Sequence, residues 1–464
     1  MFKGLFAPVD MTKGTPWKVI LQFTLPMLIG NIAQQLYSTV DTIVVGQFAQ
    51  NGDNAISAVG SALPILNMLL VLFIGISAGA SVMVAQYFGA KNREGMSYTV
   101  GNCITVTAIA CVGLIVVAAP FLDIVLELLN TPAETHKDCY WYLMISLIGM
   151  AGMAYYNILS GIIRGFGDSV SALVYLLVAT VINIILDLIF VINFHWDVAG
   201  VAAATVIAQF ISSALCMWKL SKMRQYFDFG KKYLRLSGGY VKTLVKLGLP
   251  SGLTQAIFSS AMIVVQSLTN QFGTQFIAAN VIVMRVDGFA MMPNFSFGTA
   301  LTTYAGQNTG ANRLDRVTKG AKQGTFMAVA CSTIITVVIL IFGKSLMGIF
   351  TDTAALVDKS YYLMKILAVG YIAVAVTQSL SGIMRGAGDT MTPMWISLIT
   401  TVIFRVPLAY GISYLTATPE MPKGIEECIQ ISLLSSWVMG AVITFIFFAV
   451  GKWKNKAIVQ QVKN

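Results

Sequence analysis

Charge is scarce in this chain, and its scarcity argues against a soluble fold. Charged residues make up 11% of the 464 residues, whereas hydrophobic residues make up 56%. A soluble domain carries roughly twice that share of charge. Histidine is scarcer still, with two residues, and the six cysteines are scattered without the spacing of a metal site. Neither residue type supports a catalytic or metal centre, so we expect a protein that is not an enzyme and that has no cofactor.

Long apolar runs fill much of the chain. Examples are residues 104–119, 173–191 and 328–342, each close to the ~20 residues with which a helix crosses a bilayer. These runs do not alternate every second residue, as the strands of a membrane barrel do. The sequence therefore predicts an all-α integral membrane protein. Its twelve transmembrane helices are expected at about residues 17–47, 55–84, 98–118, 140–163, 170–193, 199–220, 243–270, 276–305, 321–343, 361–384, 394–414 and 429–451.

The two halves of the chain repeat one another. Residues 159–169 read LSGIIRGFGDS and residues 380–390 read LSGIMRGAGDT, with eight of the eleven positions identical. Six spans in each half return the chain to the same side of the membrane, so the repeats run parallel. In both copies glycine permits a tight turn, and Asp168 or Asp389 can cap the next helix.

The repeat divides the chain into domains. We predict two pseudo-symmetric six-helix bundles, at residues 1–220 and 243–464, the second ending in a short basic tail. Residues 221–242 join them, and they mix Lys and Arg with aromatic residues. That mixture is typical of an amphipathic segment on the inner membrane surface, so we expect a cytoplasmic amphipathic linker.

The positive charge is distributed unevenly among the predicted loops. The formal net charge is +10. If the N-terminus is cytoplasmic, the inside segments hold 23 of the 30 Lys and Arg, the outside segments hold five, and two lie within spans. This positive-inside asymmetry favours a cytoplasmic location for both termini. We expect a multi-pass protein of a bacterial cytoplasmic membrane, in contact with the lipid bilayer and with no nucleic-acid partner.

Ionisable residues within membrane spans are rare and usually functional. In the first half these residues are Asp41 on the first span and Asp187 on the fifth. Polar residues that share a helix face with an acid, or lie on neighbouring spans, are Gln34, Tyr37, Ser38, Asn157, Thr180, Asn183, Thr205 and Gln209. Desolvation disfavours a charged carboxylate, so such a group can exchange a proton near neutral pH, or bind Na⁺ with neighbouring oxygens. The alternative is a hydrogen-bonded contact between helices without turnover.

The second half carries a different set of ionisable residues within its spans, namely Arg285, Asp287 and Arg405. A structural ion pair between Asp287 and Arg405 is one interpretation. A polar cavity is the other, in which the flexible thioethers of Met284 and Met291 bind varied apolar cations. The positions that align with Asp41 and Asp187 are apolar in this half.

Several segments together carry a family resemblance. They are Leu25-Pro26-Met27 leading to Tyr37 and Asp41, VAQYFGA at residues 84–90, GIIRGFGD at residues 161–168, and Asn183 with Asp187. These segments resemble the MATE family of multidrug and toxic compound extrusion transporters, and most of all its bacterial branch typified by DinF and MepA. The resemblance implies a cation-coupling site formed by Tyr37, Asp41, Asn183, Asp187 and Thr205. An acid on the seventh helix, used in the NorM branch, is absent between Gln255 and Gln271.

The resemblance also implies a function. We expect a secondary active antiporter that exports amphipathic, often cationic organic compounds in exchange for H⁺ or Na⁺, by alternating access and as a monomer. The sequence does not decide between H⁺ and Na⁺ as the coupling ion, because the same oxygen ligands serve either. The alternative within the same superfamily is a flippase for a lipid-linked oligosaccharide, which should need a basic cavity for pyrophosphate. A membrane-embedded enzyme has less support, because two loop histidines and no metal motif supply no catalytic cluster, and a regulatory or purely structural protein has no need for buried acids.

Overall fold

Helix is the regular secondary structure of this computed structural model. The structure describes residues 8–48, 52–128, 131 and 133–461, without the side chains of residues 37–43, 45–48, 52–58, 60–61, 63–64, 128, 133–134 and 460–461. Every regular element of those residues is helical. In lipid a helix satisfies its backbone hydrogen bonds within one segment. Ten of the helices are long and apolar enough to cross a membrane, or up to twelve if each of two bent pairs is one span. The predicted all-helical membrane fold is confirmed.

The chain divides into two compact units. Unit 1 comprises Met1–Asp10 and Leu25–Gly252, and unit 2 comprises Met11–Thr24 and Leu253–Asn464. Two long helices pass from one unit into the other. They are α1 (Pro16–Phe48), which starts in unit 2, and α10 (Gly238–Thr269), which starts in unit 1.

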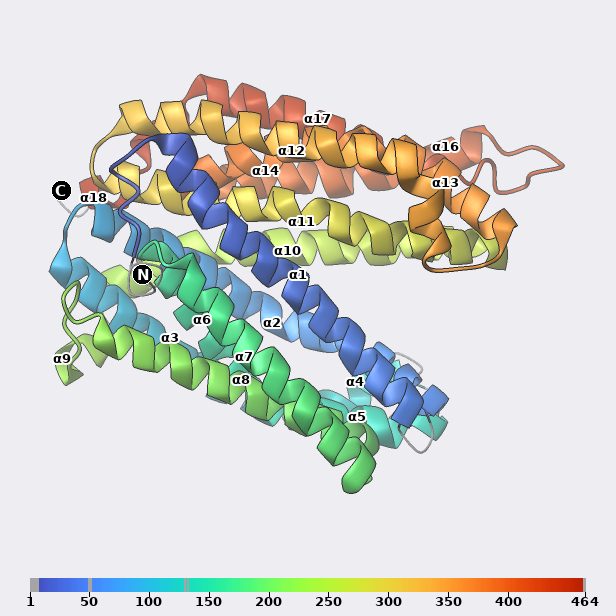
Figure 1. Ribbon diagram of the computed structural model, residues 1–464, viewed down its shortest axis with the longest axis horizontal. Helices are drawn as coiled ribbons and strands as arrows, with labels where there is room; N and C mark the ends of the chain where they lie inside the picture. Colours follow the sequence, from blue (N-terminus) through green and yellow to red (C-terminus); the bar gives the residue numbers. More distant parts are fainter. Residues whose placement is uncertain (1–7, 49–51, 129–130, 132, 462–464) are drawn as a thin grey trace. The chain divides into compact units, whose positions relative to one another are not determined.

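The remaining helices of unit 1 are drawn in the blue to green part of Figure 1. They are α2 (Gly52–Gly89), α3 (Arg93–Ala118), α4 (Leu122–Leu128), α5 (Ala133–Ile148), α6 (Met150–Gly165), α7 (Ser169–Leu188), α8 (Asp197–Lys222) and α9 (Lys231–Leu234), with the short elements η2 (Ala119–Phe121) and η3 (Ile189–Asn193). Within this unit α6 packs against both α2 and α8, so it forms the centre of the bundle.

Unit 2 repeats this arrangement. Its helices are α11 (Thr274–Gly310), α12 (Leu314–Gly348), α13 (Ala354–Ala368), α14 (Gly370–Gly386), α15 (Met391–Ser397), α16 (Val406–Leu415), α17 (Cys428–Val450) and α18 (Ile458–Gln461), with η4 (Asn270–Phe272), η5 (Leu398–Arg405) and η6 (Lys452–Asn455). Here α14 packs against α11, α12 and α17, as α6 does against its neighbours in unit 1.

Two predicted spans are bent rather than straight. The fourth is the pair α5 and α6, which meet at 48°, and the tenth is the pair α13 and α14, which meet at 44°. Equivalent glycines lie at the bends. A Cβ atom on Gly149 would come within 2.1 Å of the Val206 side chain, and one on Gly370 within 2.5 Å of Trp437. The neighbouring helix therefore occupies the space that a side chain would need, which is a contact that sequence periodicity does not reveal.

The duplicated Arg-Gly-x-Gly-Asp forms a turn in both halves, as predicted, and Asp168 is the N-cap of α7, whereas the N-cap position of α15 is Thr390, one residue after Asp389. Gly167 and Gly388 have φ of +93° and +100°, which favour glycine. Asp168 Oδ1 accepts a hydrogen bond from Ser171 N at 2.8 Å, and Asp389 Oδ1 accepts one from Thr392 N at 3.3 Å. The motif therefore serves the architecture of each bundle.

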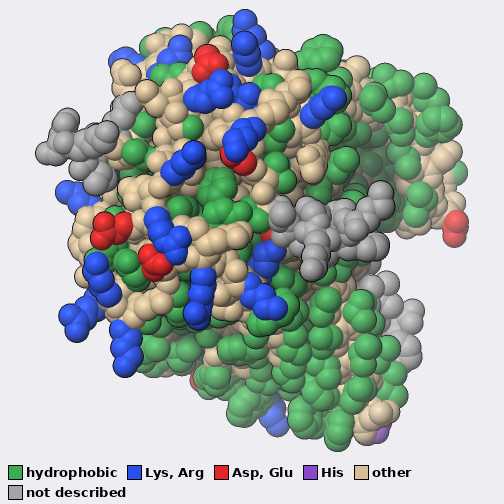
Figure 2. Space-filling view, turned by 60° about the vertical axis from the view of Figure 1, so that its left-hand side comes forward, with side chains coloured by type: hydrophobic (Ala, Val, Ile, Leu, Met, Phe, Trp, Pro, Cys, Tyr) green, Lys and Arg blue, Asp and Glu red, His purple; other side chains and the backbone are tan. Residues whose placement is uncertain are grey.

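Figure 2 shows lysine and arginine side chains gathered over one part of the face in view and broad hydrophobic surface over another. Several basic residues stand at helix ends, with Arg93 the first residue of α3, Lys222 the last of α8 and Arg313 the N-cap of α12. An apolar flank with a charged end is the surface expected of a bundle that stands in a bilayer.

Candidate functional site

Three of the predicted coupling residues lie together in unit 1. Asn183 and Asp187 are one turn apart on α7, and both are fully buried. The Asn183 Nδ2 donates to Thr205 Oγ1 on α8 at 3.4 Å. Asn183 Oδ1 is buried and accepts no hydrogen bond from the described residues. A buried oxygen in that state is uncommon, and it provides an acceptor for a proton donor or a ligand for a cation.

The other polar candidates of unit 1 are used differently. Asn157 Nδ2 donates to the Met153 carbonyl at 2.8 Å on its own helix. Gln209 lies one turn beyond Thr205 on α8, with its Oε1 buried. Gln34 on α1 is exposed. The Asn157 amide nitrogen thus makes a local contact within α6, and Gln209 follows Thr205 on the same helix.

The two remaining predicted coupling residues, Tyr37 and Asp41, belong to α1. Their side chains lie outside the described residues. Their association with Asn183 and Asp187 therefore stays a prediction.

A π-helical turn follows the acid on α7. Helix α7 ends at Leu188 and continues as the π-helical η3, which starts two residues after Asp187. The fifth span of unit 2 also contains a π-helical segment, η5, which ends at Arg405. Such turns are rare and frequently occur at functional sites, because they redirect side chains. Sequence periodicity did not predict either turn.

In unit 2 the half-buried Asp287 has a tyrosine partner that its sequence pattern did not predict. The Tyr371 hydroxyl on α14 donates to Asp287 Oδ1 on α11 at 2.9 Å. Arg405 is near enough to Asp287 for an electrostatic interaction. No ion pair between them within 4.0 Å is found among the described residues. The Arg405 Nε is buried and donates no hydrogen bond to the residues that the structure describes.

Asp287 is the middle of a polar stripe along α11, whose other members are Asn280 and Asn294, seven residues away on either side. Asn280 Oδ1 accepts from Gln430 Nε2 at 2.9 Å, and Asn294 Oδ1 accepts from Ser332 Oγ at 2.7 Å. Their spacing of seven was a signal in the sequence for one helix face. Of the other second-half candidates, Met291 packs against the apolar core of unit 2, while Met284 and Arg285 are exposed.

Comparison with known proteins gives this architecture a family. A model of the MatE family matches residues 26–189 and again residues 250–411. The second match begins at Pro250, the position that corresponds to Pro26 in the internal repeat. The probable multidrug resistance protein YoeA of Bacillus subtilis is 28% identical over 412 residues, with 87% of this chain and 89% of the relative covered.

Two further likenesses extend over nearly the whole chain. The probable multidrug resistance protein NorM of Thermotoga maritima is 25% identical over 455 residues, which cover 95% of this chain and 94% of that protein. A solved structure, described as the outward-facing conformation of a multidrug resistance MATE family transporter of the MOP superfamily, has a TM-score of 0.88 at 22% identity and covers 97% of this chain and 99% of that one. The chain belongs to the MATE (multidrug and toxic compound extrusion) family, and it is a membrane transporter rather than an enzyme.

Proposed function

We propose that this transporter is a secondary active antiporter that exports amphipathic, often cationic organic compounds in exchange for H⁺ or Na⁺. The observation that carries this proposal is the fully buried Asp187 beside Asn183, whose amide oxygen accepts no hydrogen bond from the described residues. A buried acid among oxygen ligands suits a proton or a small cation, because desolvation penalises its charged form unless a counter-charge arrives.

The coupling site comprises Tyr37, Asp41, Asn183, Asp187 and Thr205. The difference between the two halves supports its position in the first. Val265 stands where the repeat aligns it with Asp41, and it is buried in the apolar core of unit 2. Leu408 stands at the position that corresponds to Asp187. The second half thus keeps the fold without these carboxylates, so the acids of the first half are not required by the architecture.

Ion binding drives transport by a change of conformation. A proton or Na⁺ at Asp41 and Asp187 neutralises the site and shifts the equilibrium between inward- and outward-facing states of the two bundles. Pro26 lies inside α1, where it removes one backbone donor and permits the helix to bend. Bending of α1 near Pro26 then connects the occupancy of the ion site to the rocking of the bundles.

The polar stripe on α11 has a second role in this proposal. Asp287 with Tyr371 and Arg405 forms an ionisable group inside unit 2, and the exposed Met284 with Arg285 lies on the same helix. We assign this group to the binding of the polar part of the exported compound rather than to ion coupling. Tyr371 holds the carboxylate in one orientation, and the thioether adapts to varied apolar parts.

The proposal includes a membrane topology and a branch of the family. Both termini lie in the cytoplasm of a bacterial cell, in whose cytoplasmic membrane the protein works as a monomer. The missing acid between Gln255 and Gln271 favours the branch of DinF and MepA over that of NorM.

Transport in proteoliposomes tests the proposal. Purified protein is reconstituted, a proton gradient or a Na⁺ gradient is imposed separately, and movement of ethidium is followed by fluorescence. Ethidium movement driven by one gradient and abolished by its collapse is expected. Absence of driven movement under both gradients would falsify the antiport mechanism. An envelope defect in a deletion strain, without loss of drug resistance, would favour the flippase instead.

A further inference from the structure

The segment that precedes α1 and the first turns of that helix are hydrogen-bonded to unit 2, which consists mainly of the second half of the chain. Met11–Thr24 belongs to unit 2, whereas α1 from Leu25 onward belongs to unit 1. The N–H of Met11 donates to Gln307 Oε1 at 2.8 Å, and Trp17 N donates to Gln323 Oε1 at 3.1 Å. We refer to Met11–Thr24 as the N-terminal lead.

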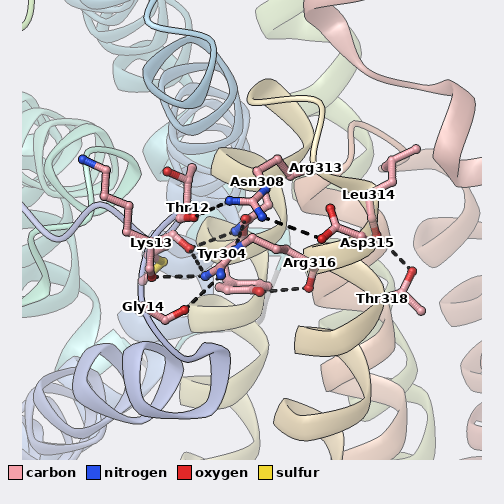
Figure 3. Close-up of polar contacts among 11 residues, drawn as sticks. Thr12, Lys13, Gly14, Tyr304, Asn308, Arg313, Leu314, Asp315, Arg316 and Thr318 are labelled. Carbon is pink, nitrogen blue, oxygen red and sulfur yellow. Dashed lines mark hydrogen bonds and ion pairs between the residues drawn. The ribbon is translucent and has the colours of Figure 1, made fainter.

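One arginine contributes three of the hydrogen bonds that hold this segment (Figure 3). From the third residue of α12, the Arg316 guanidinium donates to the carbonyls of Met11, Lys13 and Gly14 at 3.1, 3.1 and 2.9 Å. Its Nε also donates to Asn308 Oδ1 at 3.0 Å. The fixed fork of donors on a guanidinium suits several acceptors at once. All three carbonyls lie in the irregular residues before α1. These carbonyls have no partner within a helix, so the Arg316 guanidinium supplies their hydrogen-bond donors.

In the first half, Arg93 contacts the segment that precedes α10 in a corresponding way. Arg93, the first residue of α3, donates to both Asp228 carboxylate oxygens at 3.0 and 2.7 Å and to the carbonyls of Gln225 and Arg224 at 2.8 and 2.6 Å. The hydrogen bond from Arg93 lowers the pKa of Asp228 below its usual value, so this carboxylate is charged at neutral pH. We refer to residues 223–252 as the linker lead.

Packing extends both attachments into the helices. On α10, Gly248 lies so close to α2 that a Cβ atom there would be 2.7 Å from the Gly75 carbonyl. On α1, Ile20, Phe23 and Thr24 are all buried at 2% exposure or less. Each lead therefore continues as the first turns of a transmembrane helix inside one unit, and the same helix then crosses to the other unit. The crossings lie between Thr24 and Leu25 and between Gly252 and Leu253.

We propose that Arg316 and Arg93 are positioning residues for transport, which make each lead a fixed part of one unit while the helix that follows moves with the other. This inference rests on the alternating access proposed above. Because the N-terminal lead stays on unit 2, any relative motion of the units reaches α1 at its crossing, one residue before Pro26. Arg316 thereby converts motion of a bundle into a change in the helix that carries Asp41.

Covalent attachment of the lead tests this proposal directly. The six native cysteines are replaced, and Trp17→Cys is combined with Gln323→Cys, since these two positions are already in contact within unit 2. A short bifunctional thiol reagent then joins the two introduced thiols. At least about four-fifths of the uncrosslinked rate of ethidium transport should remain, since both positions belong to one moving body. Loss of transport on crosslinking, with ethidium affinity unchanged, would show that the lead must detach and would overturn the proposal.

Rescue separates positioning from a general loss of folding. Arg316→Ala should lower the initial transport rate at least about fivefold while the Kd for ethidium in detergent stays within twofold. Adding Trp17→Cys and Gln323→Cys to that variant and crosslinking the two introduced thiols should restore most of the rate, and failure to restore it would contradict the proposed role. The matched control is Lys319→Ala, an exposed basic residue one turn further along α12, which should leave the rate unchanged.

A distance measurement keeps the inference testable even if no transported compound is found. Spin labels at Lys18 and Lys319 report on the lead within unit 2, and labels at Lys222 and Lys319 report on motion between units. Conditions that shift the second distribution, such as a change of pH or of Na⁺, should leave the first unchanged. A shift in both would refute a lead that is fixed to unit 2, whereas a failure of ion-driven transport alone would bear only on the proposed function.

Discussion

The Tyr371 hydroxyl donates a 2.9 Å hydrogen bond to Asp287 Oδ1 and thereby joins α14 to α11. Tyr371→Phe should lower the free energy of unfolding by about 1 kcal/mol, because a buried hydrogen bond between membrane helices contributes on that order. The apparent Tm in detergent, followed by tryptophan fluorescence, measures the loss. In an Asp287→Asn background the same change should have a smaller effect, and equal effects in both backgrounds would indicate that the pair is not coupled.

The acids of the first half give a second prediction. Asp187→Asn and Asp41→Asn should each reduce ion-driven ethidium transport at least about tenfold, since an amide cannot exchange a proton and attracts Na⁺ less strongly. Binding of ethidium should also lose its dependence on pH or Na⁺. Asp352→Asn serves as the control, because Asp352 is an exposed acid in a loop. Coupled transport at the wild-type rate in Asp41→Asn would exclude that residue from the mechanism.

The duplicated turn gives a prediction with an internal control. Asp168 caps α7, and its Oδ2 also forms an ion pair with Lys219 Nζ at 2.8 Å. Asp389 accepts the corresponding hydrogen bond from Thr392 N at the longer distance of 3.3 Å, and no ion pair to it is found within the described part of the chain. Loss of a cap costs about 1 kcal/mol, and loss of one partner of a buried pair adds to it. Asp168→Ala should therefore lower the Tm more than Asp389→Ala, and the reverse order would contradict the assigned contacts.

Close helix packing in unit 1 gives a fourth prediction. Gly248→Ala would bring a Cβ atom to 2.7 Å from the Gly75 carbonyl, so α10 must move away from α2 and the yield of folded protein should fall. Gly113 on α3 has nothing within 4 Å of such an atom. Gly113→Ala should therefore be neutral or stabilising by up to about 1 kcal/mol, because alanine favours helix over glycine. Size-exclusion profiles and melting of the two variants provide the comparison.

Much of the fold could be predicted from local patterns. Apolar runs identify membrane helices because the bilayer imposes their length and composition on each segment separately. The duplicated turn could be read in the same way, since Gly167 and Asp168 act on their own backbone. The need for glycine at Gly149 and Gly370, where the two helix pairs bend, could not be predicted, because it arises from contacts with Val206 and Trp437, which are distant in sequence.

The candidate site was predictable only in part. Asn183 and Thr205 were named from polar residues on adjacent spans, and the structure brings them together. Tyr371 was missed because a tyrosine in an apolar span has no pattern that distinguishes a partner for Asp287 from ordinary packing. The roles of Asp41 and Tyr37 stay predictions until their side chains and their effect on transport are measured.

By itself, the amino-acid sequence established a helical membrane protein made of two parallel repeats, with carboxylates in one repeat that the other lacks. These properties follow from the composition and residue spacing of each segment and from the comparison of aligned positions in the two repeats. Tertiary packing decided which unit holds each lead, where α1 and α10 cross, and which side chains meet Asp287 and Arg316. Those features depend on contacts between residues about 80 to 300 positions apart, and hydrophobic spacing along one helix carries no information about such distant partners.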